Sequence, residues 1–270
     1  MSLGIAFKGP EGVVLGADSR VTLTSTLANG TLALSSFDSA TKLLQVAGQD
    51  HVGVVTFGQG AIGTGQAQRT AHSYVPEIER RFAGKGRLTV EQFAREIGTF
   101  FLAQWQAAPM PAKADPMTFF VAGYDDGDTY GRVFEVVIPG TPEPVEKNPN
   151  TFGLLYGGQW EITGRIMSGY DPKLPEVARK ALTLSDAQVG QLTQALSALQ
   201  LPIPMEFLPL QDCVDLVIFL IEATASLQTW MLGVRGVGGA IDVATITGTE
   251  GFRALQRKQV RGHALIQHQR

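Results

Sequence analysis

Residues 12 to 20 read Gly12-Val13-Val14-Leu15-Gly16-Ala17-Asp18-Ser19-Arg20, an apolar run that ends in a charged pair. The β-branched and small residues of this run predict a buried strand. Residues 3–8 form a similar run, and the intervening Gly9-Pro10-Glu11-Gly12 has the residue types of a hairpin turn. We therefore expect the chain to begin inside an antiparallel sheet, with Ser2 opening the first strand and Asp18 following the second.

The later segments alternate between groups of strands and groups of helices. Residues 23–41 are rich in Thr, Ser, Ala and Leu and predict a loop or weak hairpin. The other expected strands are residues 43–46, 52–57, 117–123, 133–138, 152–156 and 241–246. The expected helices are residues 61–82, 89–107, 160–168, 185–199 and 210–232. Thr89 and Gln92 have capping-box spacing at the start of the second helix.

This order predicts the α+β class and, more specifically, a four-layer αββα sandwich in which two antiparallel sheets lie between helix layers. Residues 174–209 read as a helical surface insertion that ends in a proline-rich stretch, and a polar tail with His263 and His268 is expected after the last strand. Residues 1–270 are expected to form a single domain, since 44% apolar residues suffice for one large core.

Composition argues against several classes of partner. The formal charge is -3, and acids and bases are interspersed without a basic stripe, so we expect no nucleic-acid binding. No signal peptide is recognisable, and the most apolar window, residues 216–221, is far shorter than the roughly 20 residues of a membrane span. The single cysteine, Cys213, lies in an apolar run and is predicted to be an inert buried thiol, which suits a reducing cytoplasm.

The position of Ser2 suggests a chemistry. A hydroxyl needs a nearby base to act as a nucleophile at neutral pH. If Met1 is removed, the α-amine of Ser2 is such a base, because its usual pKa is about 7.7–8.0. The pair then needs a carboxylate and a cation for orientation and tuning, and backbone N–H groups for the oxyanion. Asp18 and Lys42, at the ends of strands expected to be neighbours, are candidates for the first two.

The stretch from Gly12 to Arg20 resembles the hallmark strand of proteasome β-subunits and their bacterial relatives. In that family the nucleophile lies sixteen residues before the aspartate, as Ser2 does before Asp18. The resemblance implies roles for further residues. Ser2 takes the place of the N-terminal threonine, Asp18 orients Lys42, Lys42 lowers the pKa of the Ser2 hydroxyl and amine, and the Gly58 N–H forms the oxyanion hole. Thr22 and Arg20 are expected to bind substrate, although Arg20 also fits a structural ion pair with Asp18.

The resemblance also implies an activity and an assembly. It predicts a cofactor-free and metal-free peptidase or amide hydrolase that acts on peptides or unfolded proteins and forms a homo-oligomeric ring. It covers residues 2–60 most clearly and continues in order to about residue 170. It returns at residues 237–243. Family peptidases carry a supporting Asp and Ser where this chain has residues 233–238, and another Ser where it has residues 156–159, and here these are absent. A catalytically inactive ring or scaffold subunit, and an amidase for small non-peptide amides, therefore stay open as alternatives.

Other motifs carry weaker predictions. Gly58-Gln59-Gly60-Ala61-Ile62-Gly63 matches the dinucleotide-binding fingerprint, but the acids about 20 residues later, Glu77 and Glu79, fall within an expected helix. The four histidines show no metal-ligand spacing. The three tryptophans, Trp105, Trp160 and Trp230, are expected to pack against apolar neighbours.

Overall fold

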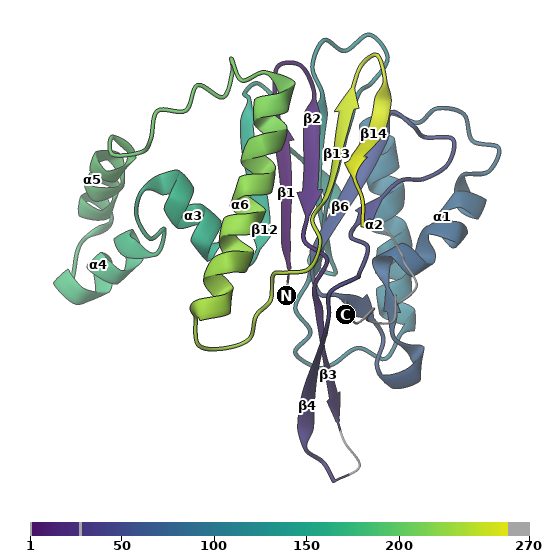
Figure 1. Cartoon of the computed structure of the whole chain (residues 1–270), viewed down its shortest axis with the longest axis horizontal. Helices are drawn as coiled ribbons and strands as arrows, with labels where there is room; N and C mark the ends of the chain where they lie inside the picture. The colour runs from purple at the N-terminus through teal and green to yellow at the C-terminus, as the bar shows by residue number, and fades with distance from the viewer. Residues whose placement is uncertain (1, 27–28, 259–270) are drawn as a thin grey trace, which may run out of the picture.

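The computed structural model describes residues 2–26 and 29–258, and these residues include two five-stranded antiparallel sheets (Figure 1). The order of the first sheet is β12(Gly153–Gly158), β1(Leu3–Lys8), β2(Val13–Ala17), β13(Asp242–Thr247) and β14(Gly251–Gln256). The order of the second is β11(Thr141–Lys147), β10(Arg132–Ile138), β9(Met117–Gly123), β6(Val52–Gly58) and β5(Leu43–Leu44). The mixed α/β character and the hairpin of β1 and β2 agree with the sequence.

Three clusters of buried apolar side chains hold these elements together. One lies between the sheets and joins β2 and β13 to β6 and β9, with Leu15 and Phe120 among its members. A second packs the other face of the second sheet against α1(Val75–Phe82) and α2(Val90–Ala107). The third packs the first sheet against α3(Glu161–Ser168) and α6(Leu210–Trp230). Figure 1 accordingly shows α3 and α6 on one side of the strands and α1 and α2 on the other.

Residues 61–82 contain the largest error of the helix predictions. A continuous helix was expected, but this segment contains β7(Ala61–Ile62), β8(Arg69–Thr70), two short 3-10 turns over Gly65–Ala67 and Ala71–Tyr74, and only then α1. Gly63 and Gly65 have positive φ values of 92° and 57°, which interrupt a right-handed helix. Pro76 then lies in the first turn of α1, where a proline is tolerated.

The second predicted helix is confirmed, including its cap. Thr89 Oγ1 accepts a hydrogen bond from Gln92 N at 3.1 Å, and Gln92 Oε1 accepts one from Thr89 N at 3.0 Å. This reciprocal pair satisfies two backbone donors that no helical carbonyl can reach. Two antiparallel strands, β3(Val21–Thr26) and β4(Leu32–Phe37), confirm the predicted hairpin and project beyond the sheets (Figure 1).

Outside residues 61–82, three more elements were missed. The edge strand β11 contains Pro142 and Pro144, which argue against a strand in the sequence although an edge tolerates them. The strand β14, at one edge of the first sheet, has mostly exposed side chains and was read as part of the polar tail. In the insertion, α4(Leu174–Leu182) precedes α5(Asp186–Ser197), and none of its residues is buried. His263 and His268 lie outside the described residues.

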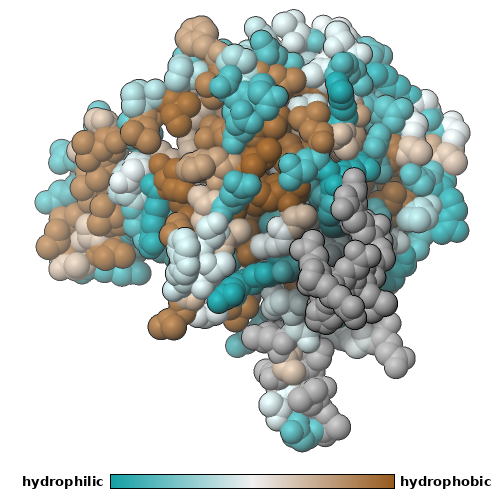
Figure 2. All heavy atoms as spheres, viewed as in Figure 1, coloured by the Kyte–Doolittle hydropathy of each residue, from teal (hydrophilic) through white to brown (hydrophobic). Residues whose placement is uncertain are grey.

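Exposed apolar side chains gather over α6 and the insertion, as Figure 2 shows. Trp230 is 77% exposed at the end of α6, so the prediction that it packs against apolar neighbours was wrong. Trp105 does pack against the α2 side of the second sheet. Cys213 is buried as predicted, and burial raises the pKa of its thiol to about 11. None of the helices within residues 2–26 and 29–258 has both the length and the apolar character that crossing a membrane requires.

Candidate active site

Asp18, at the end of β2, is fully buried and accepts hydrogen bonds from four donors. Its Oδ1 accepts from Leu3 N at 3.0 Å and from Lys42 Nζ at 2.6 Å. Its Oδ2 accepts from Arg20 N and from Gly238 N, both at 3.0 Å. A buried carboxylate is stable only with this kind of saturation. Asp18 therefore ties the start of β1, the start of the hairpin, the segment before β5 and the segment before β13 to one point.

Lys42 lies just before β5, and its side chain is 7% exposed. Desolvation by burial lowers the pKa of Lys42, while the charge and hydrogen bond of Asp18 oppose that shift. The positive charges of Lys258 and Arg20 lower it further. The net direction is downward, so the ammonium of Lys42 releases its proton more readily than a solvated lysine does.

Ser2 is buried next to this ion pair. Its carbonyl oxygen accepts a hydrogen bond from Gln159 N at 2.8 Å, and its neighbour Leu3 donates to Asp18. Gly158 has a φ of 86°, and a side chain at this position would overlap the Ser2 carbonyl oxygen. Ser2 is thus held by its backbone contact with Gln159 on one side of β1 and by the hydrogen bond of Leu3 to the Asp18 carboxylate on the other. Met1, whose removal the sequence predicts, lies outside the described residues.

Ser2 and Lys42 line one narrow pocket together with Arg20, Thr56 and Phe57. Its cavity volume is about 20 Å³, which is room for about one water molecule. Thr56 is 6% exposed, and its Oγ1 has no hydrogen-bond partner within the described residues. An unpaired buried hydroxyl is costly, so a polar group entering this pocket would gain a ready partner.

Gly58 closes β6 at the rim of this pocket. Its φ is 85°, and a side chain would overlap the carbonyl oxygen of Pro116, so the position requires glycine. Its neighbours Phe57 and Gln59 both line the pocket. The structure therefore brings Ser2, Asp18, Lys42 and the Gly58 turn to one end of the two sheets.

The two predicted substrate-binding residues lie differently. The Arg20 guanidinium lines the pocket and pairs with Asp38 through two hydrogen bonds of 2.6 and 2.7 Å. The structural alternative, an ion pair of Arg20 with Asp18, is wrong, because only the Arg20 backbone N–H contacts that carboxylate. Thr22 is half-buried on the hairpin, where its Oγ1 lies 3.1 Å from Ser36 Oγ.

Two glutamines that the sequence did not single out connect the stretches where the family's supporting residues are absent. Gln228 Oε1 accepts a hydrogen bond from Val237 N at 2.9 Å, and its Nε2 donates to Gln159 Oε1 at 3.2 Å. Gln228 is 7% exposed, on a helix whose other buried residues are mostly apolar. A glutamine among the apolar positions of a predicted helix is the one signal in the sequence that could have identified Gln228.

The dinucleotide alternative is wrong. After Gly58 the chain enters β7 instead of a helix, and β6 pairs with antiparallel neighbours, whereas the fingerprint needs a strand, a helix and a parallel strand. Within the part of the chain that the structure describes, no three His, Cys, Asp or Glu side chains come together as metal ligands.

Comparisons with known proteins agree on the fold. No protein-family model matches the sequence, and no curated protein is significantly similar to it. Among solved structures, Anbu from Yersinia bercovieri, described as an ancestral β-subunit, has a TM-score of 0.57 and 14% identity over 94% of this chain and 87% of that chain. A Gly-1 mutant of Anbu from Hyphomicrobium sp. strain MC1 has a TM-score of 0.56 and 13% identity over 96% of this chain and 86% of its own. At this identity the similarity shows that the chain shares the fold of these two Anbu proteins.

Proposed function

We propose that this chain is a proteasome-like N-terminal-nucleophile hydrolase that cleaves amide bonds of peptides through Ser2, after removal of Met1. The observation that carries the proposal is the buried ion pair of Asp18 and Lys42, which is hydrogen-bonded to the residue next to Ser2. The three core clusters support a four-layer αββα sandwich formed by a single domain over residues 1–270. The buried thiol of Cys213 fits a cytoplasmic location.

The reaction begins when the Ser2 hydroxyl attacks the substrate carbonyl carbon and passes its proton to the Ser2 α-amine. The Gly58 N–H stabilises the oxyanion of the tetrahedral intermediate. Collapse of this intermediate breaks the C–N bond, and the protonated amine returns the proton to the leaving group. Water then attacks the ester, with the amine again as base, and releases the acid. The ammonium of Lys42 lowers the pKa of the Ser2 amine, which keeps more of it neutral.

Substrate lies outside the narrow pocket that Arg20, Thr56 and Lys42 line, with its cleaved bond at the mouth of that pocket. Backbone groups of an extended peptide pair with the hairpin near Thr22, in the manner of an added strand. The Thr56 hydroxyl, which has no hydrogen-bond partner among the described residues, favours a polar group at the mouth of this pocket. No cofactor takes part in these steps.

A homo-oligomeric ring is part of the proposal. Apolar side chains that lie exposed over α6 and the insertion support it, because patches of this kind mark interaction surfaces (Figure 2). The shared fold with a protein described as an ancestral β-subunit also supports it. Sedimentation velocity of the purified protein tests this part, and a monomer at all concentrations would contradict it.

Intact-mass spectrometry with and without a peptide epoxyketone tests the chemistry. We expect loss of Met1 and one covalent adduct, which disappears in Ser2→Ala. The matched control is Ser197→Ala on the exposed end of α5, which should keep the adduct. Protein that has lost Met1 and forms no adduct would contradict the catalytic reading.

The second candidate is a catalytically inactive ring subunit. It is favoured by the absence of the family's Asp and Ser from residues 233–238. Retention of Met1 in protein from the native host would leave Ser2 without a free amine and would establish this alternative.

A further inference from the structure

A second buried pair of lysine and aspartate lies beside the first. Asp242 is the first residue of β13, and Lys258 follows β14. Lys258 Nζ donates to Asp242 Oδ2 at 2.6 Å, and Lys258 N donates to Asp242 Oδ1 at 2.8 Å. The two side chains are 12% and 3% exposed. Neither residue was among the candidates from the sequence.

Lys258 also holds the two segments that carry the first pair. Its Nζ donates to the Ala40 carbonyl oxygen at 2.8 Å and lies 3.3 Å from Ser19 Oγ. Ser19 follows Asp18 directly, and Ala40 is two residues before Lys42. An ammonium group has three donors, and here each has an acceptor. The end of the chain's last described strand is thereby fastened to the segments on both sides of the hairpin.

We propose that Lys258 is a positioning residue of the Ser2 site, which fixes the segments bearing Asp18 and Lys42 and sets the protonation of Lys42 by its charge, with Asp242 as the counter-charge. The part that concerns catalysis rests on the proposed function. The contacts themselves do not, because they are hydrogen bonds of the folded chain between partly or fully buried residues.

The charges around Lys42 and Lys258 determine the direction in which the pKa of Lys42 shifts. Lys42 is surrounded by Asp18, Arg20 and Lys258, and it also acts on Asp38. Lys258 and Arg257 act with Asp242 on His72, across a cavity of about 410 Å³ that Glu79 and Asp50 also line. Lys258 is one of the charges that lower the pKa of Lys42.

Removing the charge of Lys258 and removing the charge of Asp242 should therefore shift the pKa of Lys42 in opposite directions. In Lys258→Met a positive charge is lost, so the pKa of Lys42 rises. In Asp242→Asn the charge of Lys258 loses its counter-charge and acts more strongly on Lys42, so the pKa of Lys42 falls. A purely structural role predicts no such reversal of sign. For charges several ångströms apart in a partly buried site, a shift of about 0.5–1 pH unit is expected in each direction.

The test is a titration of the intact protein labelled with ¹³C at lysine Cε, followed by NMR, with the Lys42 signal assigned by its loss in Lys42→Arg. We expect the upward shift in Lys258→Met, the downward shift in Asp242→Asn, and little change in Lys258→Arg, which keeps the charge. The matched control is Lys147→Met on the edge strand β11. This change removes an ion pair of 2.7 Å between Lys147 and Glu135, similar in length to the pair of Lys258 and Asp242. An unchanged pKa of Lys42 in Lys258→Met, or shifts of the same sign in both variants, would overturn the proposal.

The same variants separate this inference from the proposed function. The pH profile of epoxyketone adduct formation should shift in the same directions as the pKa of Lys42. If the wild type forms no adduct while the NMR shifts appear, the proposed hydrolase activity fails and the coupling of Lys258 to Lys42 stands. If Asp242→Asn does not fold, Lys258→Met and Lys258→Arg still decide the question, because only the first changes the charge.

Discussion

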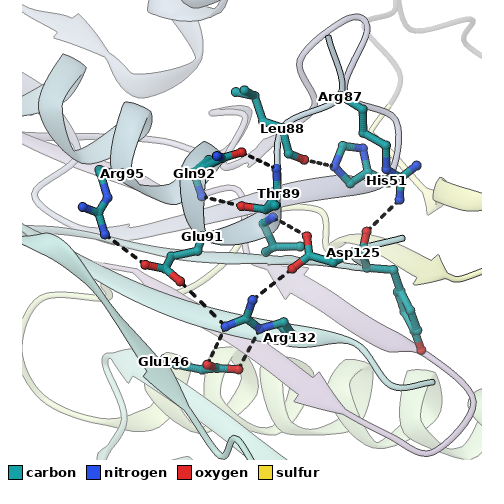
Figure 3. A network of polar contacts seen from close by, with 12 residues as sticks. His51, Arg87, Leu88, Thr89, Glu91, Gln92, Arg95, Asp125, Arg132 and Glu146 are labelled. Atoms are coloured by element: carbon teal, nitrogen blue, oxygen red, sulfur yellow. Dashed lines mark hydrogen bonds and ion pairs between the residues drawn. The ribbon is translucent and has the colours of Figure 1, made fainter. Parts of the chain in front are cut away.

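The second sheet has a cluster of charges near each end, and the two clusters are built differently. At the end where Gly58 pairs with Met117, Asp18 and Lys42 are buried beside Ser2. At the end where Val52 pairs with Gly123, Arg132 lies among several carboxylates (Figure 3). Its guanidinium donates to Glu146 at 3.0 and 2.7 Å and to Asp125 at 2.9 Å.

The pKa shifts express the difference. Hydrogen bonds to Glu146 and Asp125 raise the pKa of Arg132, and its guanidinium holds the pKa of Glu146 below the usual range. Asp125 also accepts from Val90 N at 2.7 Å, which fastens the start of α2. Lys42 is shifted the other way, because burial outweighs the attraction of Asp18. The several carboxylates around Arg132 hold it in its charged form, which suits a structural role. Lys42 has one carboxylate partner, Asp18, which also accepts three other hydrogen bonds, and its pKa is lowered.

The largest effect is expected from Asp18→Asn. This change leaves the Lys42 ammonium buried without its counter-charge, which costs about 3–5 kcal/mol in the free energy of unfolding. Urea unfolding at neutral pH measures it. Asp38→Asn is the control, because the Asp38 side chain is 49% exposed, so its pair with Arg20 should contribute less than about 1 kcal/mol. Equal losses in the two variants would contradict the special status of the buried pair.

Arg132→Met should cost about 1–2 kcal/mol at neutral pH, an estimate discounted for solvent screening of a partly exposed cluster. A carboxylate with a lowered folded pKa contributes stability that is present above its unfolded pKa and lost as the pH falls through the folded value. The wild type should therefore lose stability below about pH 4.3 more steeply than the variant. Urea unfolding over a series of pH values tests this. If the free energy of unfolding depends on pH in the same way in both proteins, Arg132 does not have this structural role.

Gln228→Ala should cost about 1–2 kcal/mol, because Val237 N–H is left buried without an acceptor. If Gln228 also supports the Ser2 site through Gln159, adduct formation slows as well, while Arg132→Met leaves its rate unchanged. The control is Gln211→Ala at the opposite, exposed end of α6. A stability loss with an unaltered adduct rate would limit Gln228 to a structural role.

The smallest effect is expected from Thr56→Val, an almost isosteric change that removes a hydroxyl without a hydrogen-bond partner in residues 2–26 and 29–258. Stability should stay within about 0.5 kcal/mol or rise, because no hydrogen bond is lost. Thr224→Val is the contrasting variant, since Thr224 Oγ1 donates to Leu220 O at 2.8 Å, and it should lose about 1 kcal/mol. A larger loss in Thr56→Val than in Thr224→Val would show that the hydroxyl has a partner.

Local signals in the sequence predicted the first hairpin and the capped helix α2, because each depends on neighbouring residues. Asp18 and Lys42 were expected at the ends of neighbouring strands, but β2 and β5 lie in different sheets, and the two side chains meet between them. Features that depend on contacts between distant parts of the chain were not predicted. The strand β14 is mostly exposed and owes its existence to pairing with β13, and Gln228 acquires its role only when α6 packs beside Gln159. Gly63 and Gly65 are visible in the sequence as possible helix breakers, but the apolar pattern of residues 61–82 favoured the prediction of a continuous helix. The pairing of Arg20 with Asp38 likewise needed the β3–β4 register.

The hairpin of β3 and β4 has a practical consequence for the chain between Asp18 and Lys42, which are 24 positions apart. Val21 pairs with Phe37 at its base, so the path between the two site residues is closed there, whatever the length beyond. Closing a longer loop costs only about 0.6 kcal/mol for each doubling, and paired strands reduce even that. The far end of the hairpin is therefore a favourable place for grafting a tag or a fluorophore, since the geometry around Lys42 is set at the base.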